Sequence, residues 1–228
     1  MKGILRNLFT ISIVILVGCA SPVADKNVFS APVVLYGDDF YIGESSGLYL
    51  IQKDGGEGYI LNNSPAFSLS MYQDYLYYGT YSLATRRPSM RFITLADIIE
   101  SQIYRLNPST LEAEELFRTG DILKNICVHN GRIFCSFSNG ERPTDNGLFV
   151  ISLDKGIRDD LVTSYSKSFC IYLDAGYYIG TREGLSGIYK INLDNHKEDL
   201  LYSIPLGTAR DLYPSIEGIY FIGYNGNT

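Results

Sequence analysis

A short pattern of hydrophobic and polar positions recurs along the chain with a spacing of roughly 40 residues. Its clearest copy, residues 186–195, combines an aliphatic residue, an aromatic residue, a variable residue and a second aliphatic residue with a closing run of Asp and Asn. Further copies begin at Gly47, Gln102 and Gly147. Alternation of this kind, followed by turn-forming residues, is typical of a short β-strand that ends in a tight turn.

Each copy stands third in a set of four apolar stretches, so the repeating unit is predicted to contain four strands. The stretches are 32–36, 40–42, 48–51 and 59–61, then 66–71, 75–78, 103–106 and 115–117, then 126–129, 132–135, 148–153 and 160–162, then 169–173, 177–179, 188–193 and 200–202. A fifth unit has only 211–213 and 219–222. Four short antiparallel strands at this spacing are the sequence signature of a β-propeller blade.

One such sheet cannot bury both of its faces alone, so the copies must stack side by side around an axis. We therefore expect an all-β fold over residues 31–228: a β-propeller of four-stranded antiparallel blades, with about four complete blades and a partial fifth. Residues 20–30 supply one further strand at most. The ring is expected to be open, or the chain to be a truncated piece of a larger propeller.

The connections divide into two sets that predict two different faces. Tight turns are expected at 37–38, 130–131, 175–176 and 217–218, and at 54–55, 107–108, 155–156 and 194–195. In an up-and-down blade these turns share one face, which we call the tight-turn face. The longer connections are expected at 80–101, 119–124, 136–146, 181–186 and 203–208 on the opposite, long-loop face. Binding tends to occur at long loops on rigid sheets, so this face is the predicted interaction surface.

Charged residues in these long connections are the candidate ligand-binding residues. They are Arg86, Arg87, Arg91, Glu141, Arg142, Arg182 and Glu183. The arginines favour a carboxylate or an acidic glycan, because guanidinium groups bind carboxylates through paired hydrogen bonds. The alternative interpretation is a solvated rim whose charges serve solubility. Within the longest connection, residues 95–100 are interpreted as one or two helical turns.

The first residues have the pattern of an export signal. A basic start, residues 1–7, precedes an apolar run, residues 8–17, that is short for a membrane span. The run ends in Leu-Val-Gly-Cys at Cys19, which resembles the lipobox of bacterial lipoproteins. The resemblance implies a signal peptide over 1–18, a diacylglycerol group on Cys19, and a tether over 19–30 on the exported side of the cell membrane or outer membrane. The alternative is an ordinary secretory signal with a chance cysteine.

Paired tyrosines mark the second strand of two units, as Tyr77-Tyr78-Gly79-Thr80 and Tyr177-Tyr178-Ile179-Gly180. Together with the recurring third strand, this resembles the blades of the YWTD propellers of lipoprotein receptors and their exported bacterial relatives. The resemblance covers most of the predicted propeller and implies a shared blade architecture. It implies no particular ligand.

Composition narrows the function classes further. The net charge of −6 disfavours nucleic acid as a partner. Three cysteines, Cys127, Cys135 and Cys170, lie in apolar strand patterns and are predicted to be buried thiols, with a Cys127–Cys170 bridge as the alternative. No metal site or cofactor is expected, because His129 and His196 lack ligand-like spacing to each other or to the cysteines.

Two functions of different classes remain from the sequence. The first is a membrane-anchored binding or scaffold module for a protein or glycan, without catalysis. The alternative is a cell-envelope glycosidase or lyase that uses carboxylates at the channel mouth, for which Asp121, Asp211 and Glu44 are the candidates. Acids about 5–10 Å apart in a concave pocket would favour the enzyme.

Overall fold

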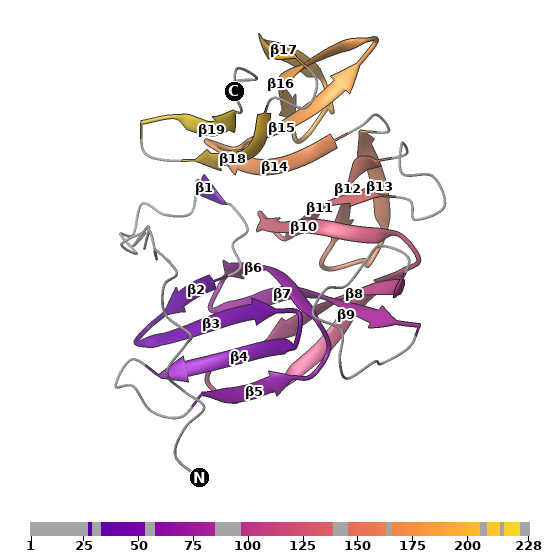
Figure 1. Ribbon diagram of the computed structural model, residues 1–228. Helices are drawn as coiled ribbons and strands as arrows, with labels where there is room; N and C mark the ends of the chain where they lie inside the picture. Colours follow the sequence, from indigo (N-terminus) through magenta and orange to yellow (C-terminus); the bar gives the residue numbers. More distant parts are fainter. Residues whose placement is uncertain are drawn as a thin grey trace, which may run out of the picture.

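The computed structural model describes residues 27–28, 33–52, 58–84, 97–138, 146–162, 166–205, 209–214 and 217–223. This part of the chain consists of β-strands joined by turns (Figure 1). Within it, no helix has the length and apolarity needed to cross a bilayer.

The strands form five antiparallel sheets, which we call blades 1 to 5. Blade 1 contains β2 (Val33–Tyr36), β3 (Asp39–Glu44), β4 (Gly47–Gln52) and β5 (Tyr59–Asn62). Blade 2 contains β6 (Ala66–Tyr72), β7 (Tyr75–Leu83), β8 (Ile98–Leu106) and β9 (Ala113–Thr119). Blade 3 contains β10 (Ile122–His129), β11 (Arg132–Ser138), β12 (Asn146–Ser152) and β13 (Arg158–Val162). Blade 4 contains β14 (Ser166–Tyr172), β15 (Ala175–Arg182), β16 (Leu185–Asn192) and β17 (Glu198–Ser203), and blade 5 contains β18 (Ala209–Pro214) and β19 (Ile219–Gly223).

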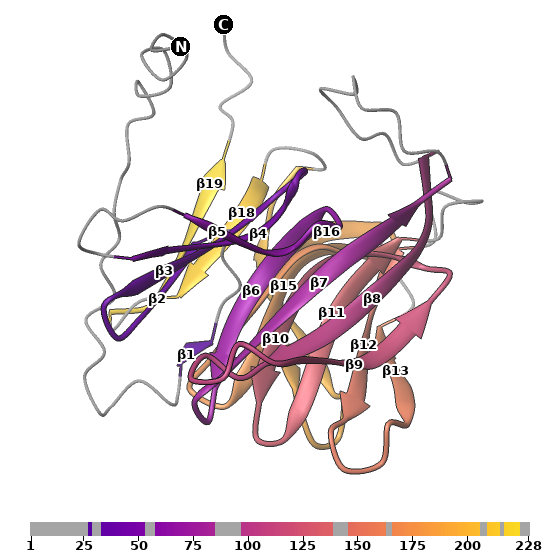
Figure 2. The same cartoon turned by 90° about the horizontal axis from the view of Figure 1, so that it is seen from below.

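The blades follow one another around an arc, with the first strand of each toward the middle (Figure 1). The arc is open between blade 5 and blade 1, as Figure 1 shows. In the turned view of Figure 2, hairpin turns of blades 3 and 4 gather at one edge of the molecule. The all-β fold of four complete blades and a partial fifth, in an open ring, is therefore confirmed.

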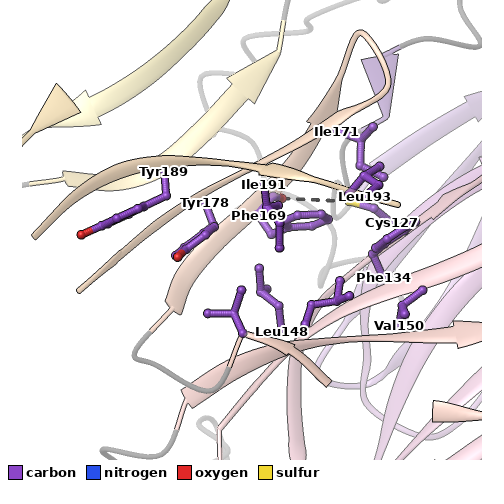
Figure 3. Close-up of a cluster of buried hydrophobic side chains, with 12 residues drawn as sticks. Cys127, Phe134, Leu148, Val150, Phe169, Ile171, Tyr178, Tyr189, Ile191 and Leu193 are labelled. Carbon is purple, nitrogen blue, oxygen red and sulfur yellow. Dashed lines mark hydrogen bonds between the residues drawn. The ribbon is translucent and has the colours of Figure 1, made fainter. Parts of the chain in front are cut away.

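The hydrophobic core lies between the blades. Side chains from facing sheets form four apolar clusters, one at each boundary between successive blades. At the boundary of blades 3 and 4, the rings of Phe134 and Phe169 stack with centroids 5.9 Å apart (Figure 3). Each such buried aromatic side chain stabilises the fold by about 1.5–3 kcal/mol. Because both faces of blades 2, 3 and 4 are apolar, each blade depends on its neighbours.

A β-bulge occurs at the same point in each of the four complete blades, between the third and fourth strands. The residue just before the bulged pair is Gly47, Gly147 or Gly187 in three blades. A Cβ atom at these glycines would lie 2.1, 2.3 and 2.2 Å from a backbone oxygen of the outer strand. Only a glycine allows the outer strand to approach so closely. In blade 2 the same position holds Gln102, so this blade departs from the repeat.

The turns on the tight-turn face agree with the prediction in blade 3 and differ in blade 4. Asn130 and Gly131 join β10 to β11 with φ angles of 47° and 68°. In blade 4 the predicted turn at 175–176 is wrong, because Ala175 and Gly176 already pair within β15. The turn lies at Leu173 and Asp174, which have φ angles of 48° and 59°.

Some connections predicted to be long are short. In blade 4, residues 181–186 contain only a two-residue turn at Glu183 and Gly184, flanked by paired strand residues. Blades 2 and 3 are likewise joined only by Gly120 and Asp121. The helical interpretation of 95–100 is wrong where the structure describes it, since Ile98 begins β8. The remaining long connections, 85–96 and 139–145, lie outside the described residues.

The three cysteines of the propeller are buried thiols outside any disulfide, as predicted, and the alternative Cys127–Cys170 bridge is not formed. Burial raises the pKa of the Cys170 thiol to about 12 and also raises that of Cys135. A thiol is reactive as its thiolate, so the raised pKa values lower the reactivity of Cys135 and Cys170 in the folded protein.

A short strand precedes the repeats. β1 (Asn27–Val28) pairs antiparallel with β14, with Asn27 opposite Tyr172 and Val28 opposite Ile171. It adds a fifth strand to blade 4 on the edge that faces the middle of the arc. In the described part of segment 20–30, residues 27–28, the chain thus forms a strand, in agreement with the prediction of one strand at most.

Candidate functional site

Most of the sequence-predicted site residues lie outside the described part of the chain. These are Cys19 together with Arg86, Arg87, Arg91, Glu141 and Arg142. Arg182 and Glu183 are described, and they lie at the long-loop end of blade 4, where β15 turns into β16.

Arg182 forms an ion pair within its own blade. Its guanidinium group contacts the carboxylate of Glu198 on β17, and its Nε atom lies 3.8 Å from the Glu183 carboxylate. The Glu198 side chain is only 7% exposed, so the pair reaches from the exposed Arg182 to a buried carboxylate. The charge of Glu198 raises the pKa of Arg182. Burial, followed by the nearby Glu198, raises the pKa of the Tyr178 phenol.

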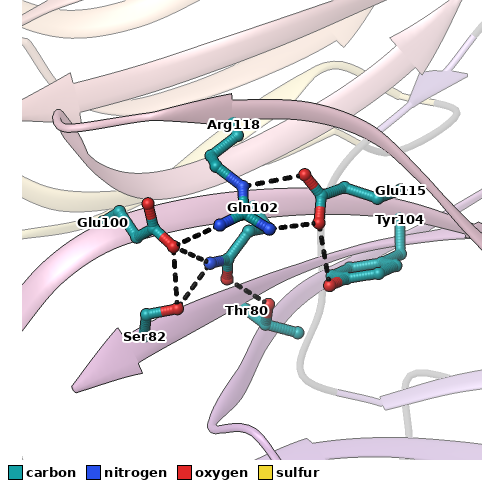
Figure 4. Close-up of polar contacts among 7 residues, drawn as sticks. All are labelled: Thr80, Ser82, Glu100, Gln102, Tyr104, Glu115 and Arg118. Atoms are coloured by element: carbon teal, nitrogen blue, oxygen red, sulfur yellow. Dashed lines mark hydrogen bonds and ion pairs between the residues drawn. The ribbon is translucent and has the colours of Figure 1, made fainter.

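A larger polar network covers the long-loop end of blade 2 (Figure 4). It contains Thr80 and Ser82 of β7, Glu100, Gln102 and Tyr104 of β8, and Glu115 and Arg118 of β9. Arg118 donates two hydrogen bonds to Glu115, of 2.9 and 2.7 Å, and one of 2.7 Å to Glu100. One guanidinium group thus holds carboxylates of two adjacent strands.

The inner end of the network is formed around the Gln102 amide. Thr80 donates a hydrogen bond of 2.9 Å to the amide oxygen of Gln102. The amide nitrogen donates to Glu100, at 2.8 Å, and to Ser82. Thr80 and Gln102 are 1% and 4% exposed, so these polar groups depend on one another for their hydrogen bonds. A fully satisfied buried network of this kind makes the surrounding strands rigid.

The electrostatics of the network favour its charged form. The hydrogen bonds from Arg118 lower the pKa of Glu115, and those to Glu115 raise the pKa of Arg118. The Tyr104 hydroxyl donates to Glu115 at 3.2 Å, and partial burial, with the Glu115 charge, raises the pKa of this phenol. At neutral pH the network therefore pairs an ionised Glu115 with a protonated Arg118.

The network lies at the base of the longest connection. β7 and β8 have nine residues each, whereas β3 and β4 of blade 1 have six. A hydrogen bond of 2.9 Å from the Ala84 amide to the Asp97 carbonyl closes the base of segment 85–96. The charged groups of the network bind one another, and they thereby hold the stem of this segment in place.

The sequence reasoning did not find this network. Its signal is the residue at the glycine position of the repeat, because Gln102 stands where three blades have glycine. A second signal is the polar alternation of Thr80 with Ser82 and of Glu100 with Gln102 along strands that are otherwise apolar. Thr80, Ser82 and Glu100 fall within the predicted long connection 80–101, whereas Gln102 begins a predicted strand, so the alternation across this boundary was not recognised.

Of the candidate acids of the enzyme alternative, Asp121 lies in the connection between blades 2 and 3, and Glu44 lies in blade 1. Asp121 accepts a hydrogen bond of 2.6 Å from Arg158 of β13, the outer strand of blade 3. The Arg158 guanidinium group also lies 4.1 Å from the Phe149 ring centroid. Glu44 is an exposed residue at the end of β3. The side chain of Asp211 lies outside the described residues.

The two histidines lie at turns on the tight-turn face. His129 lies beside the turn that joins β10 to β11, where its Nε2 atom is 3.0 Å from Asp174. His196 has a φ angle of 58° in the turn between β16 and β17. Among the described residues, no cluster of three or more His, Cys, Asp or Glu side chains is suitable for a metal ion.

No family model matches the chain, and no curated protein matches it in sequence. Solved structures do match its fold. Oligogalacturonate lyase from Vibrio parahaemolyticus has a TM-score of 0.56 at 10% identity, over 84% of this chain and 57% of that one. TolB from Acinetobacter baumannii has a TM-score of 0.52 at 14% identity, over 89% of this chain and 47% of that one. A chain of a nidogen–laminin complex has a TM-score of 0.54 at 11% identity, over 86% of this chain and 72% of that one.

These similar proteins are β-propellers, which establishes the fold class of this chain. At 10–14% identity the likeness concerns the fold alone. The chain spans 57% of a manganese-bound oligogalacturonate lyase and 47% of TolB. It is thus similar to about half of the length of these structures.

Proposed function

We propose that the protein is an exported, lipid-anchored β-propeller that binds a carboxylate-bearing protein or glycan through its long-loop face. The observation that carries this proposal is the departure of blade 2 from the repeat. Gln102 replaces the repeat glycine, and a buried polar network supports the stem of segment 85–96. The network lies at the base of the longest connection, and binding tends to occur at long loops on rigid sheets, which supports a role for this connection in binding.

The chemistry of the proposed ligand follows from the sequence of segment 85–96. Segment 85–96 contains Arg86, Arg87 and Arg91. Guanidinium groups form paired hydrogen bonds with carboxylates, which suits uronic or sialic acids and acidic protein surfaces. Among similar folds, one enzyme is named for an acidic oligosaccharide and another propeller was solved in complex with laminin, so both kinds of partner are reasonable probes.

Two finer assignments belong to the same proposal. The paired tyrosines of β7 and β15 support a place among the exported YWTD-like propellers. The lipobox-like sequence at Cys19 supports attachment to the exported side of the cell membrane or outer membrane. Cys19→Ala should leave folding intact and move the protein from the membrane fraction to the soluble fraction. A variant that stays with the membranes after a high-salt wash would refute the anchor.

A glycan array tests the ligand class. Binding should be confined to glycans with uronic or sialic acid, and Arg86→Ala combined with Arg87→Ala should reduce it at least tenfold. The matched control, Lys155→Ala combined with Lys197→Ala, removes the same charge from the tight-turn face and should bind like the parent. Equal binding of neutral glycans, or equal loss in both double variants, would contradict the proposal. Shortened glycan products would instead favour the carbohydrate-active enzyme.

A further inference from the structure

The direction of β1 determines the face at which the N-terminal segment joins the propeller. β14 ends at Tyr172, directly before the turn at Leu173 and Asp174 on the tight-turn face. β1 runs antiparallel to β14 and begins with Asn27 opposite Tyr172. The chain therefore enters β1 from the tight-turn face, beside the middle of the arc (Figure 1).

The distance between this point and Cys19 is limited by the length of the chain. Eight residues lead from Cys19 to Asn27. A fully extended chain spans at most about 3.6 Å per residue, so the two lie within roughly 29 Å of each other. A lipid group on Cys19 would hold the entry point of β1 within this distance of the bilayer. The long-loop face lies at the opposite ends of the strands.

The tight-turn face also carries exposed aliphatic side chains at its turns. Leu111, Ile157 and Leu173 are 44%, 62% and 57% exposed, and they come from three different blades. Leu111 and Leu173 have positive φ angles, of 58° and 48°. A bulky residue in this left-handed region is unfavourable, and Gly156 occupies the position in blade 3 that Leu111 occupies in blade 2. Both leucines thus occupy an unfavourable backbone conformation while about half of each side chain is exposed.

We propose that the anchored protein lies with its tight-turn face against the bilayer, with Leu111, Ile157 and Leu173 in contact with the headgroup region. The long-loop face, with the stem of segment 85–96, then points away from the membrane. This inference rests on the proposed lipid anchor at Cys19. The partner is the surface of an electroneutral phospholipid bilayer, because the exposed acids at the turns of this face outnumber its exposed lysines, Lys155 and Lys197, and disfavour anionic lipids; the acids are Asp38, Asp74, Asp154, Asp174 and Asp194.

Tryptophan fluorescence tests this orientation, since the protein contains no tryptophan of its own. The two probes are Ile157→Trp on the tight-turn face and Leu185→Trp on the long-loop face. Ile157 and Leu185 are 62% and 56% exposed in the protein, so the probes are matched in exposure. The lipidated full-length variants are reconstituted into vesicles of phosphatidylcholine brominated near the headgroup end of its acyl chains. Bromine quenches only fluorophores that it approaches closely.

With brominated vesicles, we expect strong quenching and a blue shift of the Ile157→Trp fluorescence. With unbrominated vesicles, Ile157→Trp should show the blue shift without the quenching. Leu185→Trp should show neither change. Quenching of Leu185→Trp instead, or of neither probe in protein that floats with the vesicles, would overturn the orientation. Protein that does not float with the vesicles would fail at the anchor, which is a failure of the proposed function. In a second test, Leu111→Gly combined with Leu173→Asn should reduce the quenching of Ile157→Trp. An unchanged value would refute a role for the two leucines.

Discussion

Replacement of Gly147 by alanine gives a direct test of the packing between the third and fourth strands. A Cβ atom at this position would lie 2.3 Å from the Val162 carbonyl oxygen and 2.8–2.9 Å from the Phe137 ring. The backbone oxygen cannot move unless the outer strand moves with it. Gly147→Ala should therefore push β13 away from β12 at the bulge.

The magnitude follows from what this displacement breaks. Loss of one or two ladder hydrogen bonds costs about 1–2 kcal/mol. Overpacking beside the fully buried Leu148 and Phe149 adds about 1–3 kcal/mol. We expect the free energy of unfolding to fall by about 3 kcal/mol, which lowers Tm by roughly 6–12 °C in a domain of this size.

Urea unfolding followed by far-UV circular dichroism measures the effect against two other glycines. Nothing lies within 4 Å of a Cβ at Gly120 or Gly156, and only Gly156 has a positive φ angle, of 62°. Gly120→Ala should change the free energy of unfolding by less than about 0.5 kcal/mol. Gly156→Ala should cost about 1–2 kcal/mol, because alanine resists the left-handed conformation. If Gly147→Ala were no more destabilising than Gly120→Ala, the steric reasoning would be wrong.

Three further predictions concern groups described above. Gln102→Ala should lower the free energy of unfolding by about 1–3 kcal/mol, because the buried Thr80 hydroxyl loses its partner, and urea unfolding measures this. Since Arg118 lowers the folded-state pKa of Glu115, this pair stabilises the fold above the unfolded pKa of about 4.3 and loses that effect as the pH falls. Thermal unfolding of Glu115→Gln should accordingly depend less steeply on pH than the parent between about pH 5 and pH 3. In Cys19→Ala protein, a thiol reagent at pH 8 should react only after denaturant is added. The reason is that burial raises the pKa of Cys170 and leaves all three remaining thiols inaccessible. A rapid reaction in the native state would contradict this.

The blade architecture could be predicted from the sequence, because it depends on local signals that are repeated. Alternating apolar residues determine which face of a strand is buried, and this signal occurs in every unit. Asn130–Gly131 was placed correctly, since this dipeptide adopts positive φ angles at little cost. The turn in blade 4 was misplaced because Leu173 has no turn preference of its own. The pairing of Ala175 and Gly176 with Asn192 and Ile191 of β16 determines the register there.

The candidate site was harder to predict from the sequence, because it depends on contacts between strands. The interpretation of residues 95–100 as helical turns overlooked the period-two alternation of Glu100 and Gln102, which is typical of a strand. The pairing of Gln102 with Thr80 across β7 and β8 requires the register, which the intervening segment conceals from sequence reasoning. The ion pair of Arg182 with Glu198 joins residues that are close only after the sheet has formed.

The short hairpins on the long-loop face have a practical consequence for protein engineering. Ser45–Ser46 in blade 1 and Glu183–Gly184 in blade 4 connect their strands with two residues each, at positions equivalent to the longest connection of blade 2. Insertions in surface hairpins cost little, because the entropy of loop closure grows only slowly with length. Peptides grafted at these two points would leave the same face of the scaffold as the stem formed by β7 and β8. The molecule is therefore a suitable frame for displaying several designed recognition loops at once.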